Sequence, residues 1–472
     1  MIFHRSFLPG LAVASYLVGD ETTRECAVID PTRDVHDLVN LARTEGLKIR
    51  HILETHVHSD FVSGARELTA CLEDPAQVHC SGLGGKQCTP AYADSIIEDG
   101  DEIQFGSIRL CAIHTPGHTV EHVMWGLFDM ARSKDTPWLL FTGDFLLVGG
   151  VGGPDSTSHS EREELSHQLY QSVFERLRIF PDYTEVHPGR GRSETGCPLP
   201  GKGRYSRASS TLGYERRFNP ALERLSEAEW VDKLLADMEP APSYYRRMKE
   251  VNIAGPEIIG SRLPGCRALT AGAVQERMSE NCNILDVRPK EAFATAHLPG
   301  AINIPLDANL AAWAARVLDY DRPTLLVVDD PLDVDEVVGQ LLCVGFDDIC
   351  GYLKGGLAAW EGHALKFGCL ATIDVEQLHD QLTGPGHWVP FLLDVRARAE
   401  WASGHIDTAS HIDCAHLKDR LLEVPQDRPV AVICCSGDRS TIAASLLQSR
   451  GYREISHVLG GMSAWSKRIR DH

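Results

Sequence analysis

The second half of this 472-residue chain carries nearly the same sequence twice. Residues 284–288 read ILDVR and residues 392–396 read LLDVR, and in each copy a Gly-Gly pair precedes a tryptophan, within residues 355–360 and 460–465. The spacing between the copies is far longer than the roughly 20–50 residues of a solenoid repeat. This half is therefore predicted to fold as two copies of one α/β domain, in each of which an apolar strand leads into Asp-Val-Arg.

The first half alternates short apolar or β-branched runs with helical patterns. Strands are expected at residues 27–29, 49–53, 108–113, 138–141 and 184–187, and helices at residues 34–45, 61–70 and 161–178. This alternation predicts a layered α/β domain in which each strand delivers a loop to one rim.

Three of these expected strands end in residues that can bind a metal. The residues are His56, His58 and Asp60 in THVHSD, His118 in HTPGHT, and Asp144 in TGD. Each motif alone is a common polar turn, but together and in this order they indicate a metal site. Imidazole and carboxylate ligands suit zinc or iron.

These motifs resemble the pattern of the metallo-β-lactamase fold, in which HxHxDH is followed by TPGH, by GD and by a final histidine. The resemblance covers about residues 1–250 and implies an αββα domain. Two positions depart from the pattern, because Phe61 follows Asp60 and Arg190 stands where the final histidine is expected. Neither a phenylalanine ring nor a permanently charged guanidinium can ligate a cation. We therefore expect the second metal position of a binuclear site to be absent.

The ligands that remain are His56, His118 and Asp144. Two histidines and one carboxylate with open positions are typical of non-haem Fe(II) oxygenases. The set is similar to that of the persulfide dioxygenases, which implies one mononuclear Fe²⁺ per chain, with zinc as the alternative. His58 is then either a fourth ligand of a zinc form or a group behind the ligands of an iron form, and Asp60 is expected to orient a ligand histidine.

Residues 209–220, SSTLGYERRFNP, resemble a segment of bacterial dioxygenase–rhodanese fusions. Gly150 and Gly153 stand where those fusions usually carry aspartate and arginine, a change expected to loosen the loop after Asp144 or to alter the substrate pocket. Five basic residues are candidates to contact carboxylates of the thiol substrate: Arg190, Arg192, Lys202, Arg216 and Arg217. The alternative interpretations are a salt bridge for Arg190 and a solvated basic face for Lys202, Arg216 and Arg217.

Each half of the repeat resembles a rhodanese domain through its Asp-Val-Arg, His-Leu/Ile and Gly-Gly-x-x-x-Trp signatures. In the second copy an apolar strand ends at CCSGDRS, residues 434–440, just before a helix. The backbone N–H groups of such a loop and the helix N-terminus stabilise a thiolate. The family's CxxGxR spacing implies that Cys434 is the nucleophile, with Gly437 and Arg439 in the same loop and Arg439 holding the anionic sulfur species.

The first copy lacks that cysteine. Its strand ends at Asp329, which we expect in the nucleophile's place, so this copy is interpreted as a degenerate rhodanese domain that serves as a spacer or docking surface. A linker rich in Gly-Pro and Pro-Gly pairs is expected at residues 251–268. The expected α/β domains are residues 1–252, 265–368 and 369–472.

The net charge of the chain is −20, from 46 Lys and Arg against 66 Asp and Glu, and it is spread along the sequence. Such a charge disfavours nucleic acid and anionic membranes as partners. No window approaches the roughly 18 apolar residues of a membrane helix, and Pro9-Gly10 interrupts the run that imitates a signal peptide. The 14 cysteines contain no CxxC pair and are expected to be reduced thiols of a cytoplasmic protein. Acidic multi-domain enzymes of this kind are often homo-oligomers.

The resemblance implies two linked activities. The iron site would oxidise a glutathione-like or coenzyme A-like thiol persulfide with O₂ to sulfite and free thiol. Cys434 would carry sulfane sulfur to sulfite, forming thiosulfate, or run the reverse exchange. Two alternatives stay open: a zinc thioester hydrolase similar to glyoxalase II, and a metal-free binding module that feeds the rhodanese. Phe61 and Arg190 argue against the first, and the intact ligand set argues against the second.

Overall fold

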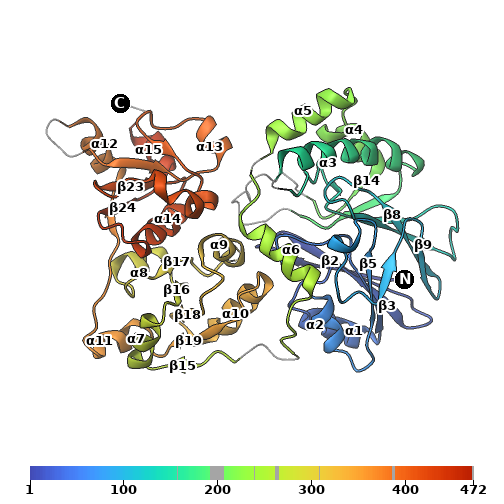
Figure 1. The fold of residues 1–472 in the computed structure, drawn as a ribbon, viewed down its shortest axis with the longest axis horizontal. Coiled ribbons are helices and arrows are strands. Elements are labelled where there is room, and N and C mark those ends of the chain that lie inside the picture. Colours follow the sequence, from blue (N-terminus) through green and yellow to red (C-terminus); the bar gives the residue numbers. More distant parts are fainter. Residues whose placement is uncertain are drawn as a thin grey trace. The chain divides into compact units, whose positions relative to one another are not determined.

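The computed structural model describes residues 1–156, 158–191, 207–238, 240–260, 265–307, 309–384 and 389–469. The chain divides into two compact units, Met1–Leu263 with Leu342–Gly345, and Pro264–Leu341 with Phe346–His472 (Figure 1). Arg192 and Lys202, two of the basic residues considered as substrate contacts, lie outside the described residues.

The first unit contains two six-stranded sheets. One sheet has the order β1-β2-β3-β4-β5-β6, with strands Ile2–Leu8, Val13–Gly19, Glu25–Ile29, Lys48–Leu53, Gln77–Ser81 and Ser95–Ile97. The other has the order β14-β13-β10-β9-β8-β7, with strands Ser210–Thr211, Glu185–Pro188, Leu139–Gly143, Val123–Asp129, Ile108–His114 and Glu102–Phe105. A short hairpin, β11 Leu146–Leu147 and β12 Gly150–Val151, follows the end of β10.

Helices cover the outer faces of the two sheets. They are α1 His36–Glu45, α2 Ala65–Ala70, α3 His159–Gln171, α4 Leu212–Phe218 and α5 Glu227–Asp237, and α6 Tyr244–Ala254 ends the unit's helices. Figure 1 shows α1 and α2 together and α3, α4 and α5 together. Because α6 continues to Ala254, the linker begins later than the sequence predicted.

Three apolar cores separate these four layers. Side chains alternate across a strand, so Tyr16 of β2 packs with Trp125 of β9 between the two sheets. Its neighbour Leu17 faces the other way and packs with Leu38 of α1. On the outer side of the second sheet, Leu140 packs with α3 and α5. These layers confirm the αββα domain and the strands predicted from its apolar runs.

The second unit holds two sheets of the same topology. The first has the order β15-β19-β18-β16-β17, with strands Ala268–Leu269, Ile349–Leu353, Thr324–Val327, Asn283–Asp286 and Ile302–Asn303. Its helices are α7 Ala271–Ser279, α8 Lys290–Thr295, α9 Leu310–Val317, α10 Val334–Cys343 and α11 Gly356–Gly362. The second has the order β20-β24-β23-β21-β22, with strands Ala371–Ile373, Ile455–Val458, Val430–Ile433, Phe391–Asp394 and Ser410–His411. Its helices are α12 Val375–Thr383, α13 Arg398–Ala402, α14 Asp438–Ser449 and α15 Gly461–Arg468. The shared strand order confirms the duplication.

The repeated sequence signatures have structural causes in both copies. Asp286 accepts three hydrogen bonds from the guanidinium of Arg288 and one from its backbone N–H, and Asp394 holds Arg396 in the same way. In the second copy, the ring of His405 stacks on the ring of Trp401, with centroids 3.7 Å apart. Buried charge-assisted bonds of this kind are strong and directional. These signatures therefore specify the fold of the domain.

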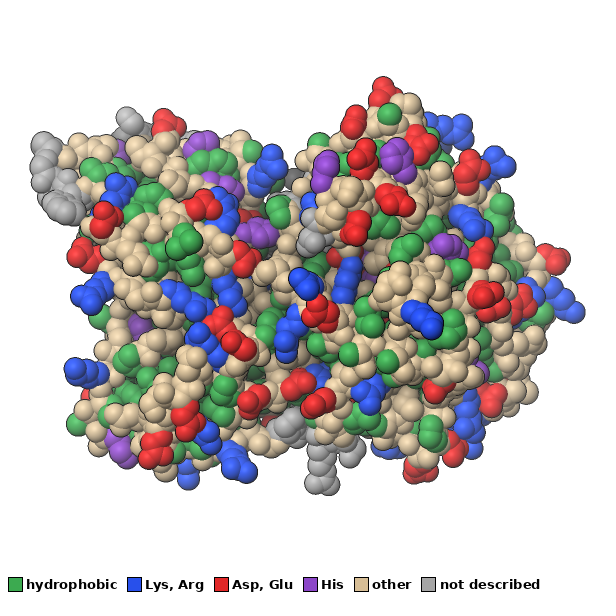
Figure 2. Space-filling model, viewed as in Figure 1, with side chains coloured by type: hydrophobic (Ala, Val, Ile, Leu, Met, Phe, Trp, Pro, Cys, Tyr) green, Lys and Arg blue, Asp and Glu red, His purple; other side chains and the backbone are tan. Residues whose placement is uncertain are grey.

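The distribution of charged side chains and the state of the cysteines are as the sequence predicts. Figure 2 shows acidic and basic side chains intermingled over the face in view, as expected for charge spread along the chain. Every described cysteine is a free thiol. Within the described part of the chain, no helix is both long enough and apolar enough to cross a membrane.

Candidate metal centre and sulfur-transfer loop

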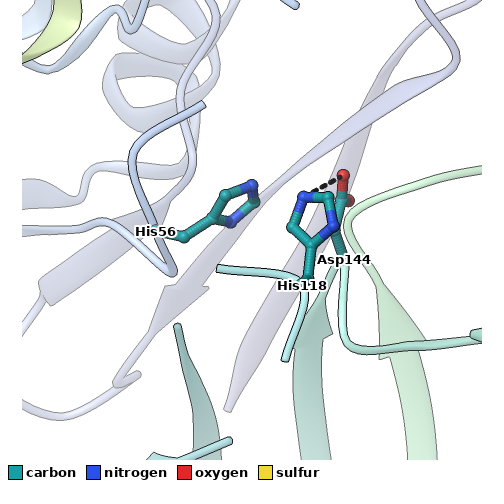
Figure 3. A group of neighbouring side chains, drawn as sticks. All are labelled: His56, His118 and Asp144. Carbon is teal, nitrogen blue, oxygen red and sulfur yellow. Dashed lines mark ion pairs between the residues drawn. The ribbon is translucent and has the colours of Figure 1, made fainter. Parts of the chain in front are cut away.

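The structure brings together the three residues that the sequence predicts as metal ligands. His56 follows β4, His118 lies in the turn after β8, and Asp144 follows β10 (Figure 3). One ligand atom from each lies within 4.8 Å of the other two, and His118 Nε2 is 3.6 Å from Asp144 Oδ2. Three strand ends therefore converge on one point, as predicted.

The hydrogen bonds of His56 fix which of its nitrogens faces this point. The Thr55 hydroxyl donates to Asp30, with 2.8 Å between the oxygens, and so accepts from His56 Nδ1 at 2.9 Å. His56 Nε2 is buried and has no hydrogen-bond partner among the described residues. Burial, aided by the nearby histidines and Arg190, holds the His56 pKa well below its usual range, so the ring is neutral. An orphaned, neutral imidazole nitrogen is what a metal ligand requires.

His118 is oriented in the same sense by a backbone carbonyl. The carbonyl oxygen of Gly153 lies 2.7 Å from His118 Nδ1, and a carbonyl can only accept. Nδ1 therefore carries the proton and Nε2 presents its lone pair toward Asp144. Two oriented Nε2 atoms beside one carboxylate oxygen fit a divalent metal ion of the iron or zinc class.

Arg190 occupies the side of Asp144 where a second metal ion would need ligands. Its Nε donates to both oxygens of Asp144, at 2.9 and 2.8 Å. Its terminal nitrogens donate to both oxygens of Asp60, one of them at 2.6 Å. Arg190 is 3% exposed. Arg190 therefore forms salt bridges, as one of its two interpretations predicted. Its guanidinium lies between Asp60 and the predicted ligand Asp144.

His58 turns toward a different pair of carboxylates. Its Nε2 lies 3.2 Å from Asp30 and 3.4 Å from Glu54. Burial alone would lower its pKa, but these two carboxylates outweigh burial and raise the pKa of His58 to about 10. A protonated imidazole has no lone pair for a metal. His58 therefore fits the second of its two predicted roles, a group behind the ligands.

His122 and Asp30 support the site, although neither belongs to the motifs that predict it. The backbone N–H of Asp144 donates to His122 Nε2 at 3.2 Å, and His122 Nδ1 is 2.9 Å from the Thr115 hydroxyl. His122 thereby holds the backbone of a ligand. Their positions in the sequence could have indicated this role. Asp30 follows an apolar strand, as the predicted ligands do, and His122 precedes the buried strand β9.

The loop after Asp144 is held by the block that resembles dioxygenase–rhodanese fusions. Buried Glu215 accepts from the Gly149 backbone N–H at 2.8 Å, and Asn219 donates to the Gly150 carbonyl at 3.0 Å. Arg216 instead pairs with Asp182 and donates to two backbone carbonyls, and the Arg217 guanidinium lies over the Phe218 ring. These contacts support a solvated basic face for Arg216 and Arg217, the alternative to contact with a substrate carboxylate.

Gly152 leaves no room for a side chain beside the site. A Cβ atom built on Gly152 would lie 1.8 Å from the Asp144 carbonyl oxygen. We expect Gly152→Ala to displace Asp144 and to weaken metal binding roughly 10- to 100-fold, as changes behind metal ligands do. Competition against a fluorescent chelator measures this affinity.

The matched control is Gly272→Ala in α7, where an added Cβ meets nothing within 4 Å. This variant should keep the metal affinity and stabilise its helix by up to about 1 kcal/mol. Equal metal affinity in the Gly152→Ala and wild-type proteins would contradict the close packing around Asp144.

The second centre is the loop between β23 and α14. Cys434 is 1% exposed, and its Sγ accepts from the Gly437 backbone N–H at 3.1 Å. Gly437 has a φ of +117°, a left-handed conformation that favours glycine. The Ser440 hydroxyl lies 3.4 Å from the same sulfur and 2.9 Å from His457 Nδ1. The loop therefore places one backbone donor, the Gly437 N–H, and the N-terminus of α14 beside the predicted nucleophile.

The Gly-Gly signature belongs to this loop. A Cβ on Gly461 would lie 2.3 Å from the Cys434 carbonyl oxygen, and that carbonyl accepts from the Met462 backbone N–H at 2.8 Å. Arg439 is buried and donates from both terminal nitrogens to Glu400 of α13, at 2.5 and 2.8 Å. Its described contacts thus anchor the loop to α13, a partner that the sequence did not reveal.

The middle domain places a different residue at the nucleophile's position than the sequence predicted. Asp286 pairs with Val327 across the sheet as Asp394 pairs with Ile433. The residue that follows the strand, equivalent to Cys434, is therefore Val328. The prediction for Asp329 was wrong by one residue because the apolar run continues through Val328, whereas the strand itself ends at Val327. Neither residue has a thiol, so the middle domain still lacks the nucleophile.

Comparisons with known proteins agree with this arrangement. The family model of the metallo-beta-lactamase superfamily matches residues 8–189, and that of the rhodanese-like domain matches residues 270–363 and 374–468. The mitochondrial persulfide dioxygenase ETHE1 of Bos taurus is 32% identical over 238 residues, which cover 50% of this chain and 82% of the relative. A cytoplasmic hydroxyacylglutathione hydrolase of Arabidopsis thaliana is 32% identical over 177 residues, covering 37% of this chain and 62% of the relative.

Among solved structures, a metallo-beta-lactamase from Staphylococcus aureus aligns with a TM-score of 0.66 at 33% sequence identity. The alignment covers 75% of this chain and 99% of that protein, and so extends well beyond the first domain. The ligand set, the folds and the relatives agree: this chain belongs to the ETHE1 persulfide dioxygenase family, and its metallo-beta-lactamase domain is followed by two rhodanese-like domains.

Proposed function

We propose that the first domain oxidises a small thiol persulfide with O₂. One persulfide, one O₂ and one water would give one free thiol, one sulfite and two protons. The observation that carries the proposal is the Arg190 guanidinium, which pairs with Asp60 and Asp144 and leaves His56, His118 and Asp144 as one three-ligand group beside it. His56, His118 and Asp144 would hold one ferrous ion there, and iron in such a set supplies O₂ chemistry at its open positions.

The protein residues orient and isolate this position. The Thr55 hydroxyl and the Gly153 carbonyl set the two imidazole tautomers, and Arg190 fixes the plane of the Asp144 carboxylate. Fixed donors and ligands need no reorganisation when substrate arrives. The substrate class is a low-molecular-weight thiol persulfide of the glutathione or coenzyme A type.

A zinc thioester hydrolase is the competing function, and the Arabidopsis hydrolase is a relative of that kind. Hydrolysis at a binuclear site needs a second metal position, with ligands on both sides of a bridging oxygen. In this chain Phe61 and Arg190 replace two such ligands, and the relative named for persulfide oxidation is matched over more of its length. These observations favour the dioxygenase.

For the third domain we propose sulfur transfer through Cys434. A persulfide on Cys434 would pass its outer sulfur to sulfite, releasing thiosulfate and a cysteine thiolate, or the same exchange would run in reverse. The Gly437 N–H and the N-terminus of α14 lie where the thiolate charge forms. Sulfite, the product of the first reaction, is the acceptor in the second, so one chain can link both.

One experiment separates these functions. We expect about one iron per chain, O₂ uptake on glutathione persulfide, and loss of that uptake after chelation with recovery on adding Fe²⁺. Sulfur transfer should survive chelation, because Cys434 needs no metal. Two zinc ions per chain with thioester cleavage would establish the hydrolase, and a protein that binds no metal would leave the first domain as a binding module.

A further inference from the structure

The domain without a nucleophile contributes a cation to the loop that has one. Lys290 is the first residue of α8 in the middle domain, and its Nζ lies 2.5 Å from Asp438 Oδ1 at the start of α14. The same Nζ is 3.5 Å from the point that a Cβ on Gly437 would occupy. Gly437 is the residue whose N–H contacts the Cys434 sulfur. The ammonium therefore stands beside the sulfur-binding loop.

Contacts between the two rhodanese-like domains fix this arrangement. Asp319 of the middle domain pairs with Arg450 at 3.0 Å and with Lys418 at 2.9 Å. The backbone N–H of Asn303 donates to the Ser445 hydroxyl within α14 at 3.0 Å. These contacts hold α14, and with it the loop at its N-terminus, against the middle domain. Lys290 thus has a defined position.

The other charged or titratable groups around the loop leave Lys290 as a suitable anion contact. Arg439 is engaged by Glu400. Burial, together with Lys290, lowers the pKa of His457 to about 4, so that ring is neutral near pH 7. Asp438 accepts from Lys290 and from the Ser436 hydroxyl. An ammonium has three donors, so Lys290 can keep Asp438 and still donate to a ligand.

We propose that Lys290 forms part of the anion-binding site of the Cys434 loop and favours sulfur donors and acceptors of the thiosulfate and sulfite class. This role rests on the sulfur transfer proposed for Cys434. It gives the middle domain a function in substrate recognition, although that domain has no nucleophile of its own. The side chain of Lys290 is 25% exposed, so an ion from solvent can reach it.

Two alkylating agents of similar size but different charge test the proposal on the full-length protein. The probes are iodoacetate, an anion, and iodoacetamide, which is neutral, and the readout is the alkylation rate of Cys434 measured by mass spectrometry. Cys435→Ser provides the background, so that one reactive cysteine remains in the loop peptide. Lys290→Met should lower the iodoacetate-to-iodoacetamide rate ratio by about threefold to tenfold, as expected from losing one charge beside the loop in a partly solvated site.

Two further variants make the result specific. Lys290→Arg keeps the positive charge and should keep most of the rate ratio, and Lys354→Met removes an exposed lysine elsewhere in the same domain and should leave the ratio unchanged. An unchanged ratio in Lys290→Met, or an equal fall in Lys354→Met, overturns the proposal.

Steady-state turnover gives a second measurement. With thiosulfate as donor and cyanide as acceptor, Lys290→Met should raise the KM for thiosulfate severalfold while kcat changes little. If the wild-type protein forms no thiocyanate, the function proposed for Cys434 is wrong, and the alkylation ratio still decides whether Lys290 attracts anions to the loop.

Discussion

Cys434→Ser should lose sulfur transfer by a factor on the order of 10³ or more, as enzymes do when their nucleophile is removed. Serine keeps the shape of the side chain, but its hydroxyl does not form a persulfide under these conditions. The loop should stay folded for two reasons. The Gly437 N–H can donate to a serine oxygen as it does to the sulfur, and the Met462 N–H donates to the backbone carbonyl of residue 434, which the substitution does not change. Thiocyanate formation from thiosulfate and cyanide measures the loss.

O₂ uptake on glutathione persulfide should be largely retained in Cys434→Ser, because the metal ligands lie in the other compact unit. The matched control is Cys435→Ser, which changes the adjacent, partly exposed thiol and should retain both activities. A loss of both activities in Cys434→Ser would show that the two centres depend on one another.

Arg190→Met should lower the free energy of unfolding of the first domain by about 3–5 kcal/mol, because it leaves Asp60 and Asp144 buried without their cation. Methionine fills much of the volume of the arginine stem, so loss of packing contributes little. The urea midpoint of the first domain's transition measures the change. Metal affinity should fall as well, since Asp144 loses the group that fixes its plane.

The control for this variant is Arg246→Met. Arg246 is 85% exposed and pairs with Glu250 one helical turn away, an interaction that contributes about 0.3–0.5 kcal/mol. Similar losses of stability in the two variants would mean that the buried pairs around Arg190 contribute no more than a surface pair.

Much of the fold and the centre of each site could be predicted because they depend on local pattern. The apolar runs before His56, His118 and Asp144 end where the strands end, and parallel or neighbouring strands bring such ends to one rim. The repeated domain could also be predicted from local pattern, because Asp286 and Arg288 bond to each other within three residues of sequence.

The partners of these residues were harder to predict because they come from distant segments. Asp30 reaches Thr55 and His58 from another strand, and Arg190 meets Asp60 across 130 residues of sequence. A sequence shows that each residue is polar and near a strand end, but the pairing depends on how the sheets pack. The middle domain shows a similar limit, because its apolar run extends one residue beyond the strand and only the sheet register identifies Val328 as the equivalent of Cys434.

The salt bridges of Arg190 with Asp60 and Asp144 also determine the net charge beside the candidate metal site. Two carboxylates and one guanidinium, all buried together, carry a single net negative charge in the protein alone. A divalent ion held by His56, His118 and Asp144 would change this to a single net positive charge. An ionised persulfide, with one negative charge, would then bring this group to neutrality, whereas a neutral thioester would not. Buried charge that stays unbalanced is costly, so under the function proposed above we expect charge balance around Arg190 to favour an anionic sulfur substrate over a neutral thioester.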